Sequence, residues 1–417
     1  EISCSLVGSE MCIRDRFNIW NDFPQKPLPE LLDFIVDNRG KTVPTVSQEE
    51  ACEIVLIATN CIRNENLYPV YEKVRYISKE TYEKWFRAHP ISGDIIFVNK
   101  GTPGRICFCP ENIDFCIAQD MMAFRVNSSV LYNKYLLAVL RSREMQEQIR
   151  ITSVGDTIPH FKKEFLKELT IPLPPMDVQQ IIGDYYFKLS EKIELNKKIN
   201  ENLEQQAQAL FKAWFVDFEP FGGVMPDDWR MGTLSEICGY SKDKIDIDNL
   251  TLDSYYSTEN MHPNRQGAVQ ATTLPTIKQT TACKKGDVLI SNIRPYFKKI
   301  LYCFSDCGCS TDVLCFVPNK TDYSAFLYCA LYADKFFDYM VAGSKGTKMP
   351  RGDKQQIMVY PICIPSAEYI EKFNQAVASM LETVYTNRIE ENNLANLRDT
   401  LLPKLMNGEI DVSAVKI

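Results

Sequence analysis

Histidine is scarce in this chain of 417 residues, which contains only three. Fifteen cysteines are present. The densest group of them matches no standard spacing for zinc ligands: Cys303, Cys307, Cys309 and Cys315. A metal site is therefore not expected. Reduced thiols on strands and their turns, as in a cytoplasmic protein, are the simpler interpretation.

Long apolar runs and common catalytic motifs are missing as well. No run approaches the roughly 20 apolar residues of a membrane-spanning helix. The sequence contains no GxxxxGK[ST] loop, no HExxH, no nucleophile elbow and no strand–GxGxxG–helix unit. No two carboxylates form a convincing acid–base pair. These absences disfavour an enzyme and leave no catalytic residue to nominate.

Length and charge set the remaining bounds. A chain of 417 residues with 45% hydrophobic and 24% charged residues indicates two or three ordinary globular domains. The net charge of −7 argues at first against nucleic acid, but the acidic excess lies in residues 177–219 and 367–411. The rest is neutral overall and free to carry basic patches. Residues 1–16 read as a foreign leader and are excluded from the fold argument.

Two stretches predict long helices with matching seams. In the first, a heptad stripe runs from Ile182 to Trp214 and is interrupted by asparagine. A shift of 191 residues aligns it with a second stripe from Phe373 to Leu405, which is also polar near its middle. Two matched seams predict antiparallel pairing within one chain. The expected pairing residues are Ile193, Asn196, Asn200, Leu203, Leu210, Val384, Asn387, Glu391, Leu394 and Leu401.

The same shift relates the segments before each helix, so the chain contains an internal repeat. Short alternating runs such as DIIFV and VLISN predict strands, and 132–149 and 323–340 predict helices. Each half is therefore expected to be an α+β domain followed by one long helix. The predicted boundaries are 17–172 and 221–363 for the globular domains, and 173–220 and 364–417 for the helical parts.

Polar and basic loops recur at equivalent places in the two halves. Arginine and lysine can engage phosphates or guanine, whereas asparagine, glutamine and glutamate can read adenine or cytosine. Any single loop is better explained as a solvated turn, but the recurrence of the whole set in both halves favours DNA contact. The candidate residues are Arg39, Lys41, Thr59, Asn60, Arg63, Lys100, Thr102, Arg105, Thr157, His160, Lys162, Thr258, Glu259, Asn260, Arg265, Arg294, Tyr296, Lys298, Lys345, Lys348 and Arg351.

With these segments in view, the chain resembles a specificity subunit of a type I restriction–modification system. The resemblance covers residues 26 to about 413. It is strongest in IPLPPMDVQQIIGDYYFKLSEKIELNKKINENLEQQAQALFKAWFVDFEPF (171–221) and in LRDTLLPKLMNGEIDV (397–412). RGKTVP, GDIIFVNKGTPG and GDVLISNIRPYFKK resemble segments of the family's recognition domains.

The resemblance implies two target recognition domains related by a pseudo-twofold axis and separated by two antiparallel helices. Each domain would read one half of a bipartite double-stranded DNA site. The helices would act as a ruler and dock two adenine-N6 DNA methyltransferase subunits, and motor–nuclease restriction subunits would complete the complex. The chain itself would catalyse nothing and bind no cofactor. S-adenosylmethionine, ATP and magnesium would be bound by the partner subunits.

Two other functions stay open at this point. One is a stand-alone DNA-modifying enzyme with a non-local site, which activity of the pure protein on DNA would reveal. The other is a coiled-coil scaffold without DNA specificity, which binding to a defined split site would exclude. The DNA target itself cannot be read from these residues.

Overall fold

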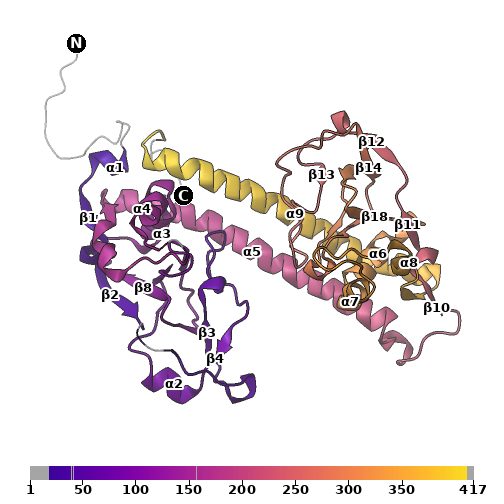
Figure 1. Cartoon of the computed structure of the whole chain (residues 1–417), viewed down its shortest axis with the longest axis horizontal. Helices are drawn as coiled ribbons and strands as arrows, with labels where there is room; N and C mark the ends of the chain where they lie inside the picture. The colour runs from indigo at the N-terminus through magenta and orange to yellow at the C-terminus, as the bar shows by residue number, and fades with distance from the viewer. Residues whose placement is uncertain (1–17, 39, 41, 156, 411–417) are drawn as a thin grey trace, which may run out of the picture. The chain divides into compact units, whose positions relative to one another are not determined.

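The computed structural model describes residues 18–38, 40, 42–155 and 157–410. The suspected leader and two candidate residues, Arg39 and Lys41, lie outside this range. The chain divides into two compact units, the first made of 1–195 and 391–417 and the second of 196–390. Both units mix helices and strands (Figure 1), as the α+β prediction requires. Among the described residues, no helix is long and apolar enough to cross a membrane.

The first unit contains a four-stranded antiparallel sheet in the order β2–β8–β5–β6, a three-stranded sheet β4–β3–β7 and the pair β1–β9. Its strands are β1 (Gln25–Pro27), β2 (Leu32–Asp37), β3 (Val55–Ile57), β4 (Arg75–Tyr76), β5 (Ile95–Val98), β6 (Ile106–Phe108), β7 (Phe115–Ile117), β8 (Met121–Val126) and β9 (Thr170–Pro172). Its helices are α1 (Ile19–Asp22), α2 (Lys79–Lys84), α3 (Asn133–Arg141), α4 (Arg143–Thr152) and the start of α5 (Met176–Phe215).

The second unit repeats this plan with sheets β11–β18–β15–β16, β12–β14–β17–β13 and the pair β10–β19. Its strands are β10 (Arg230–Thr233), β11 (Cys238–Tyr240), β12 (Lys244–Asp246), β13 (Tyr255–Tyr256), β14 (Gln279–Cys283), β15 (Val288–Ser291), β16 (Ile300–Tyr302), β17 (Cys307–Cys309), β18 (Val313–Pro318) and β19 (Pro361–Ile364). Its helices are the second half of α5, α6 (Ser324–Tyr332), α7 (Asp334–Ala342), α8 (Lys354–Met358) and most of α9 (Ala367–Met406), whose end belongs to the first unit.

The internal repeat is confirmed by the topology. The sheets β2–β8–β5–β6 and β11–β18–β15–β16 have equivalent strand orders, and each unit also contains one parallel pair, β3–β7 or β13–β17. The helices α5 and α9 are both 40 residues long. They begin at Met176 and Ala367, 191 positions apart, which is the shift found in the sequence.

The alternation of side chains between the two faces of a strand explains why the apolar segment of β5 forms a central strand. In β5, Ile95 and Phe97 pack in the core under the helices, whereas Ile96 and Val98 pack in a second core towards the small sheet. A strand places successive side chains on opposite faces, so both faces of this strand are buried. The loops that follow β5 and β15 are thereby fixed at the edge of a rigid sheet.

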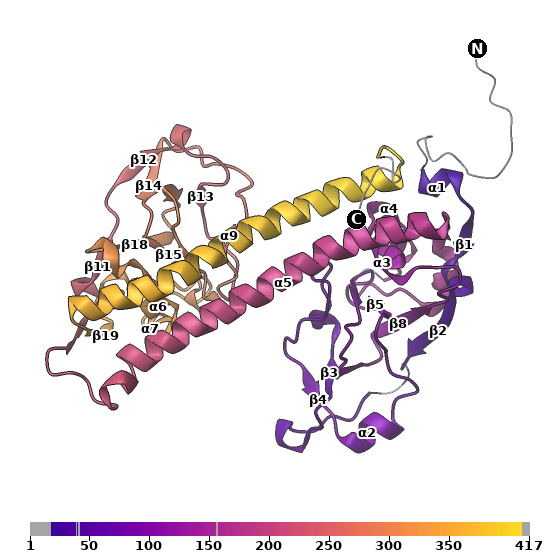
Figure 2. The same ribbon diagram turned by 180° about the vertical axis from the view of Figure 1, so that it is seen from behind.

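The predicted antiparallel helix pairing is confirmed. In the second unit, Asn196 Nδ2 donates to Glu390 Oε2 at 2.6 Å and Asn387 Nδ2 donates to Asn200 Oδ1 at 2.8 Å. As the residue number rises along α5, the number of its partner on α9 falls, so the two helices run antiparallel. In the first unit, Arg398 Nη1 lies 3.4 Å from Ser190 Oγ. Figure 2 shows both helices from behind as continuous ribbons.

The predicted seam is buried or half-buried throughout. The fully buried members are Ile193, Asn196, Asn200 and Val384, and the half-buried ones are Leu203, Leu210, Asn387, Glu391, Leu394 and Leu401. The sequence did not predict a second apolar stripe beside the seam. It includes Ile370 and Leu381 in the second unit and Leu402 and Met406 in the first, and these side chains join the cores of the globular domains.

The thirteen cysteines within the described range are free, and all but Cys52 are buried. Many lie on strands, for example Cys107 on β6 and Cys283 on β14. Burial raises the pKa of the Cys238 thiol to about 12, because a thiolate is poorly solvated in an apolar core. No group of three or more His, Cys, Asp or Glu side chains in the described range is arranged to hold a metal ion.

Candidate nucleic-acid interface

Three of the predicted loops meet in the first unit. The loop after β5 joins the hairpin after α4, because Gly101 N donates to the carbonyl oxygen of Pro159 at 2.9 Å and a β-bridge pairs Lys100 with His160. The segment after β3 joins the same loop, since Ile106 N donates to Asn64 Oδ1 at 2.8 Å. Residues that are distant in sequence thus form one polar surface.

The corresponding three loops meet in the second unit in the same way. Arg294 N donates to the carbonyl oxygen of Pro350 at 2.8 Å, and a β-bridge pairs Ile293 with Arg351. The hydroxyl oxygens of Thr258 and Ser291 lie 3.2 Å apart, which ties the segment after β13 to the end of β15. The structure therefore brings together, once in each unit, the loops that the sequence identified as DNA-contact candidates.

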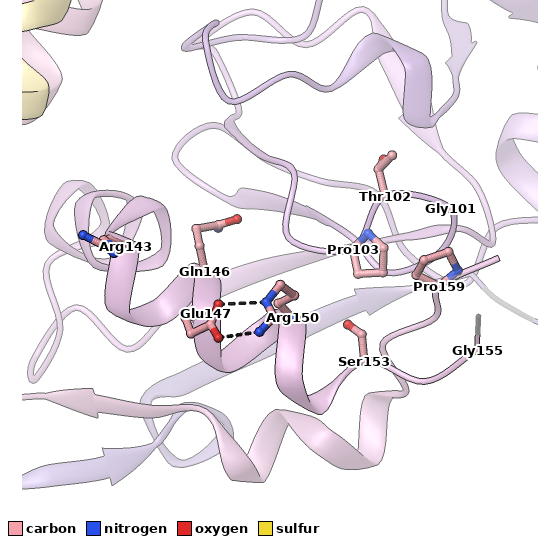
Figure 3. Close-up of a pocket in the computed structure, with 10 residues that line it drawn as sticks. All are labelled: Gly101, Thr102, Pro103, Arg143, Gln146, Glu147, Arg150, Ser153, Gly155 and Pro159. Atoms are coloured by element: carbon pink, nitrogen blue, oxygen red, sulfur yellow. Dashed lines mark hydrogen bonds and ion pairs between the residues drawn. The ribbon is translucent and has the colours of Figure 1, made fainter. Parts of the chain in front are cut away.

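A pocket of about 870 Å³ opens beside the loops of the first unit (Figure 3). It is lined by Gly101, Thr102, Pro103, Arg143, Gln146, Glu147, Arg150, Ser153, Gly155 and Pro159. The Arg150 guanidinium donates to both carboxylate oxygens of Glu147, at 2.6 and 2.8 Å. This hydrogen-bonded ion pair lowers the pKa of Glu147. The wall of the pocket therefore carries a negative charge at Glu147 and a positive charge at Arg150.

The arginines of this wall were not predicted. Arg143, Gln146, Glu147 and Arg150 are spaced three, four and seven residues apart, so they share one face of α4. That periodicity was readable in the sequence. Only the fold shows that this face borders the pocket and the loop at Thr102.

At the corresponding positions the second unit has Asp334, Phe337, Asp338 and Val341 on α7. Asp334 is paired with Arg265 at 2.6 Å and with Lys298 at 2.5 Å. Hydrogen bonds from these two cations lower the pKa of Asp334 to about 2. The Arg265 guanidinium also lies over the rings of Tyr332 and Phe337, 4.6 and 5.4 Å from their centroids.

The candidates of the first unit differ in exposure. Lys100, Thr157 and Lys162 are exposed, and Thr59, Thr102, Arg105 and His160 are half-buried. Lys162 Nζ lies 3.6 Å from Glu164. Asn60 Nδ2 donates to the Glu72 carbonyl oxygen, and Arg63 pairs with the Glu72 carboxylate. DNA contact by these residues stays a prediction.

In the second unit the exposed candidates are Glu259, Tyr296, Lys345, Lys348 and Arg351, and the half-buried ones are Thr258, Arg294 and Lys298. Lys345 pairs with Asp353 at 2.5 Å and Arg351 with Asp312 at 3.0 Å. These ion pairs are largely exposed and therefore weak.

One candidate needs correction, and a second is mostly buried. Asn260 is buried, and its amide is fully used inside its own loop: Nδ2 donates to the carbonyl oxygens of Tyr255 and Val269, both at 2.9 Å, and Oδ1 accepts from Ser257 N at 2.7 Å. The Arg265 guanidinium is mostly buried against α7. Both side chains hold the loops in place; the Asn260 amide has no donor or acceptor left for DNA, whereas DNA contact by Arg265 stays a prediction.

The comparisons with known proteins agree with this arrangement. The sequence profile described as "Type I restriction modification DNA specificity domain" matches the chain twice, over residues 26–205 and 226–398. The chain belongs to this family. We therefore name the globular parts of the first and second units the first and second recognition domains.

Characterised specificity subunits are similar over most of their length. The HindI specificity subunit of Haemophilus influenzae is 24% identical over 405 residues, which covers 76% of this chain and 86% of that protein. The MjaIX specificity subunit of Methanocaldococcus jannaschii is 26% identical over 316 residues, covering 67% and 69%. The crystal structure of a type I S subunit from M. genitalium has the same fold, with a TM-score of 0.56, 18% identity and 92% and 96% coverage.

Proposed function

We propose that this chain is the specificity subunit of a type I restriction–modification complex and that it recognises a bipartite site in double-stranded DNA. Each recognition domain reads one half of the site. The observation that carries the proposal is the duplication of the three-loop surface: Lys100 and His160 are paired in the first domain as Ile293 and Arg351 are in the second. Two such surfaces in one chain suit a target in two parts.

The partners and cofactors belong to the same proposal. Two adenine-N6 DNA methyltransferase subunits dock on the helical region, and motor–nuclease restriction subunits complete the complex. The specificity chain catalyses no step itself and acts on DNA in the cytoplasm. S-adenosylmethionine, ATP and magnesium are bound by the partner subunits.

A methylation map tests this function. The chain is expressed with its methyltransferase partner in cells that lack other adenine methylation, and modified adenines are mapped across the genome. Methylation at one split motif, lost when the chain is omitted, is the expected result. Methylation by the purified chain alone would instead indicate an enzyme. Methylation without sequence preference would indicate a scaffold without DNA specificity.

We further propose that α5 and α9 set the gap between the two half-sites. Each helix runs without interruption through 40 residues, about 60 Å at 1.5 Å per residue. Matched insertions of seven residues, after Leu195 and after Glu391, keep the heptad phase and add about 10 Å. The preferred gap should grow by about three base pairs. An unchanged gap would contradict the proposal that the two helices set the gap between the half-sites. The control is an insertion in α5 alone, which shifts the pairing register of the two helices.

A further inference from the structure

The turn η8 (Pro295–Phe297), which follows β15, exposes two aromatic rings on the second recognition domain. Tyr296 is 48% and Phe297 38% exposed, and their ring centroids lie 4.8 Å apart. We call these two side chains the aromatic tip. The equivalent loop of the first domain, 99–105, carries Thr102 and Pro103 and has no aromatic side chain. Adjacent large rings in a solvent-facing turn are costly unless they meet a partner.

The backbone holds the aromatic tip rigidly. Arg294 and Lys298 bracket the turn with φ values of +51°, a left-handed conformation that is strained for residues other than glycine. Neighbouring segments fix this backbone. Asn264 N donates to the Phe297 carbonyl oxygen at 2.8 Å, and Arg265 N to that of Lys298 at 3.0 Å. Because the turn is already ordered, little conformational entropy is lost when it binds.

Lysines lie on the segments that flank the aromatic tip. Lys299 Nζ lies 6.0 Å from the Phe297 ring centroid and donates to the Thr258 carbonyl oxygen at 2.6 Å. Lys298 Nζ is 2.5 Å from Asp334. Lys348 is exposed on the hairpin whose Pro350 accepts from the turn. Exposed rings beside Lys299, with the exposed Lys348 on the neighbouring hairpin, fit a ligand with flat apolar faces and negative charge at its edges.

We infer that Tyr296 and Phe297 form a wedge that stacks on a base of the second half-site and opens the adjacent base step. This inference rests on the proposed function. Aromatic side chains stack on any base because every base has a π face, and apolar wedges enter DNA between base pairs. The lysines around the tip engage the flanking phosphates. The first domain has no such wedge.

The test uses the full chain assembled with its methyltransferase partner and a duplex carrying the mapped target. 2-Aminopurine is placed at successive positions of the second half-site. Binding should raise its fluorescence at one position. The double variant Tyr296→Ser, Phe297→Ser should abolish the rise and weaken binding about tenfold or more. The salt dependence of binding should not change, since no charge is removed.

Met231→Ala is the matched control, because Met231 is an exposed apolar side chain on β10 and 58% exposed. It should leave both signals intact. Amide hydrogen exchange of the second unit that matches the wild type shows that the double variant is folded.

Several results overturn the wedge. Wild-type affinity and fluorescence in the double variant would do so while leaving the proposed function intact. The wedge would also be overturned if no fluorescence rise were seen and if replacing thymine by uracil weakened binding. Those two results together would show that the rings contact a thymine methyl group instead. A wild-type complex with no preference for a split site would overturn the proposed function as well.

Discussion

The loops after β5 and β15 occupy the same place in the two recognition domains but are built by different means. The first turns through glycines with positive φ, Gly101 at +84° and Gly104 at +89°, and leaves a pocket beside it. The second turns through Arg294 and Lys298 at +51° and presents the aromatic tip. Sheet order and β-bridges are shared, whereas the loop tips are not. Recognition can therefore diverge while the scaffold stays constant.

The largest expected effect comes from exchanging one domain. Replacing residues 226–363 with the matching domain of a relative should change one half of the target completely and leave the other half and the gap unchanged. Independent contribution is expected because distant sites without shared partners act additively. The methylation map is the measurement. A changed first half-site would show that the two domains do not read DNA separately.

A second comparison is between a buried and an exposed side chain of the same helix, α9. Phe373 on α9 is fully buried, with ring centroids 5.1 Å from Phe215 and 5.9 Å from Phe211. Phe373→Ala should lower the stability of the second unit by about 3–5 kcal/mol, because it leaves a cavity among aromatic rings. Amide hydrogen exchange should show the loss in the second unit only. Leu397→Ala on the same helix, where Leu397 is 45% exposed, is the control and should have little effect.

Two asparagines at the loops should behave differently. Asn260→Ala removes a buried amide whose oxygen and nitrogen are both hydrogen-bonded, so it should lower the stability by about 1–3 kcal/mol. It should also weaken binding to the second half-site without preference for any base. Asn60→Ala should leave stability nearly unchanged and relax the preference at one base pair, by about 1–3 kcal/mol if Asn60 reads a base edge. Equal base-specific effects of the two variants would show that the buried amide of Asn260 nevertheless reads DNA.

A smaller effect should separate two lysines of the hairpin after α7. Lys348→Ala should weaken binding evenly across sequences, by about 1 kcal/mol, and reduce the slope of log affinity against log salt by about 1. Lys345→Ala should change the slope less, because Asp353 already neutralises that ammonium at 2.5 Å. Titrations at several salt concentrations give both slopes. A base-specific effect at Lys348 would contradict the phosphate assignment.

The smallest effect is a pH dependence confined to the second domain. The pKa of Asp334 is lowered from 3.8 to about 2 by Arg265 and Lys298, so the stability it contributes is present above pH 4 and is lost as the pH falls through about 2. The carboxylate is 65% exposed, so after solvent screening we expect about 1 kcal/mol or less. Asp334→Asn should be less stable than the wild type at pH 6, and the difference should shrink steadily as the pH falls from 4 towards 2. A difference that persisted undiminished at pH 2 would contradict this ion-pair account.

Much of this fold was predictable because it depends on periodicity. The seam through Asn196 and Asn387 and the strand at Ile95 follow from spacings of 3.5 and 2 residues. The loops were less predictable, since a polar side chain in a turn can serve either the loop or a ligand. For that reason the sequence assigned Asn260 and Arg265 to DNA contact. Only the structure shows that these side chains are buried and which groups they bind. Pairings between distant short strands, such as β12 with β14, carry no local signal.

The division of the chain into units has a consequence for its synthesis. The second unit is one continuous stretch, 196–390, whereas the first needs the segment 391–406, where Leu402, Leu405 and Met406 complete its core. A chain made from the N-terminus therefore finishes its second unit while the first still exposes the surface around Ile182 and Tyr186. The domain begun first is completed last, and a ribosome that stops before residue 391 releases a product with an open core.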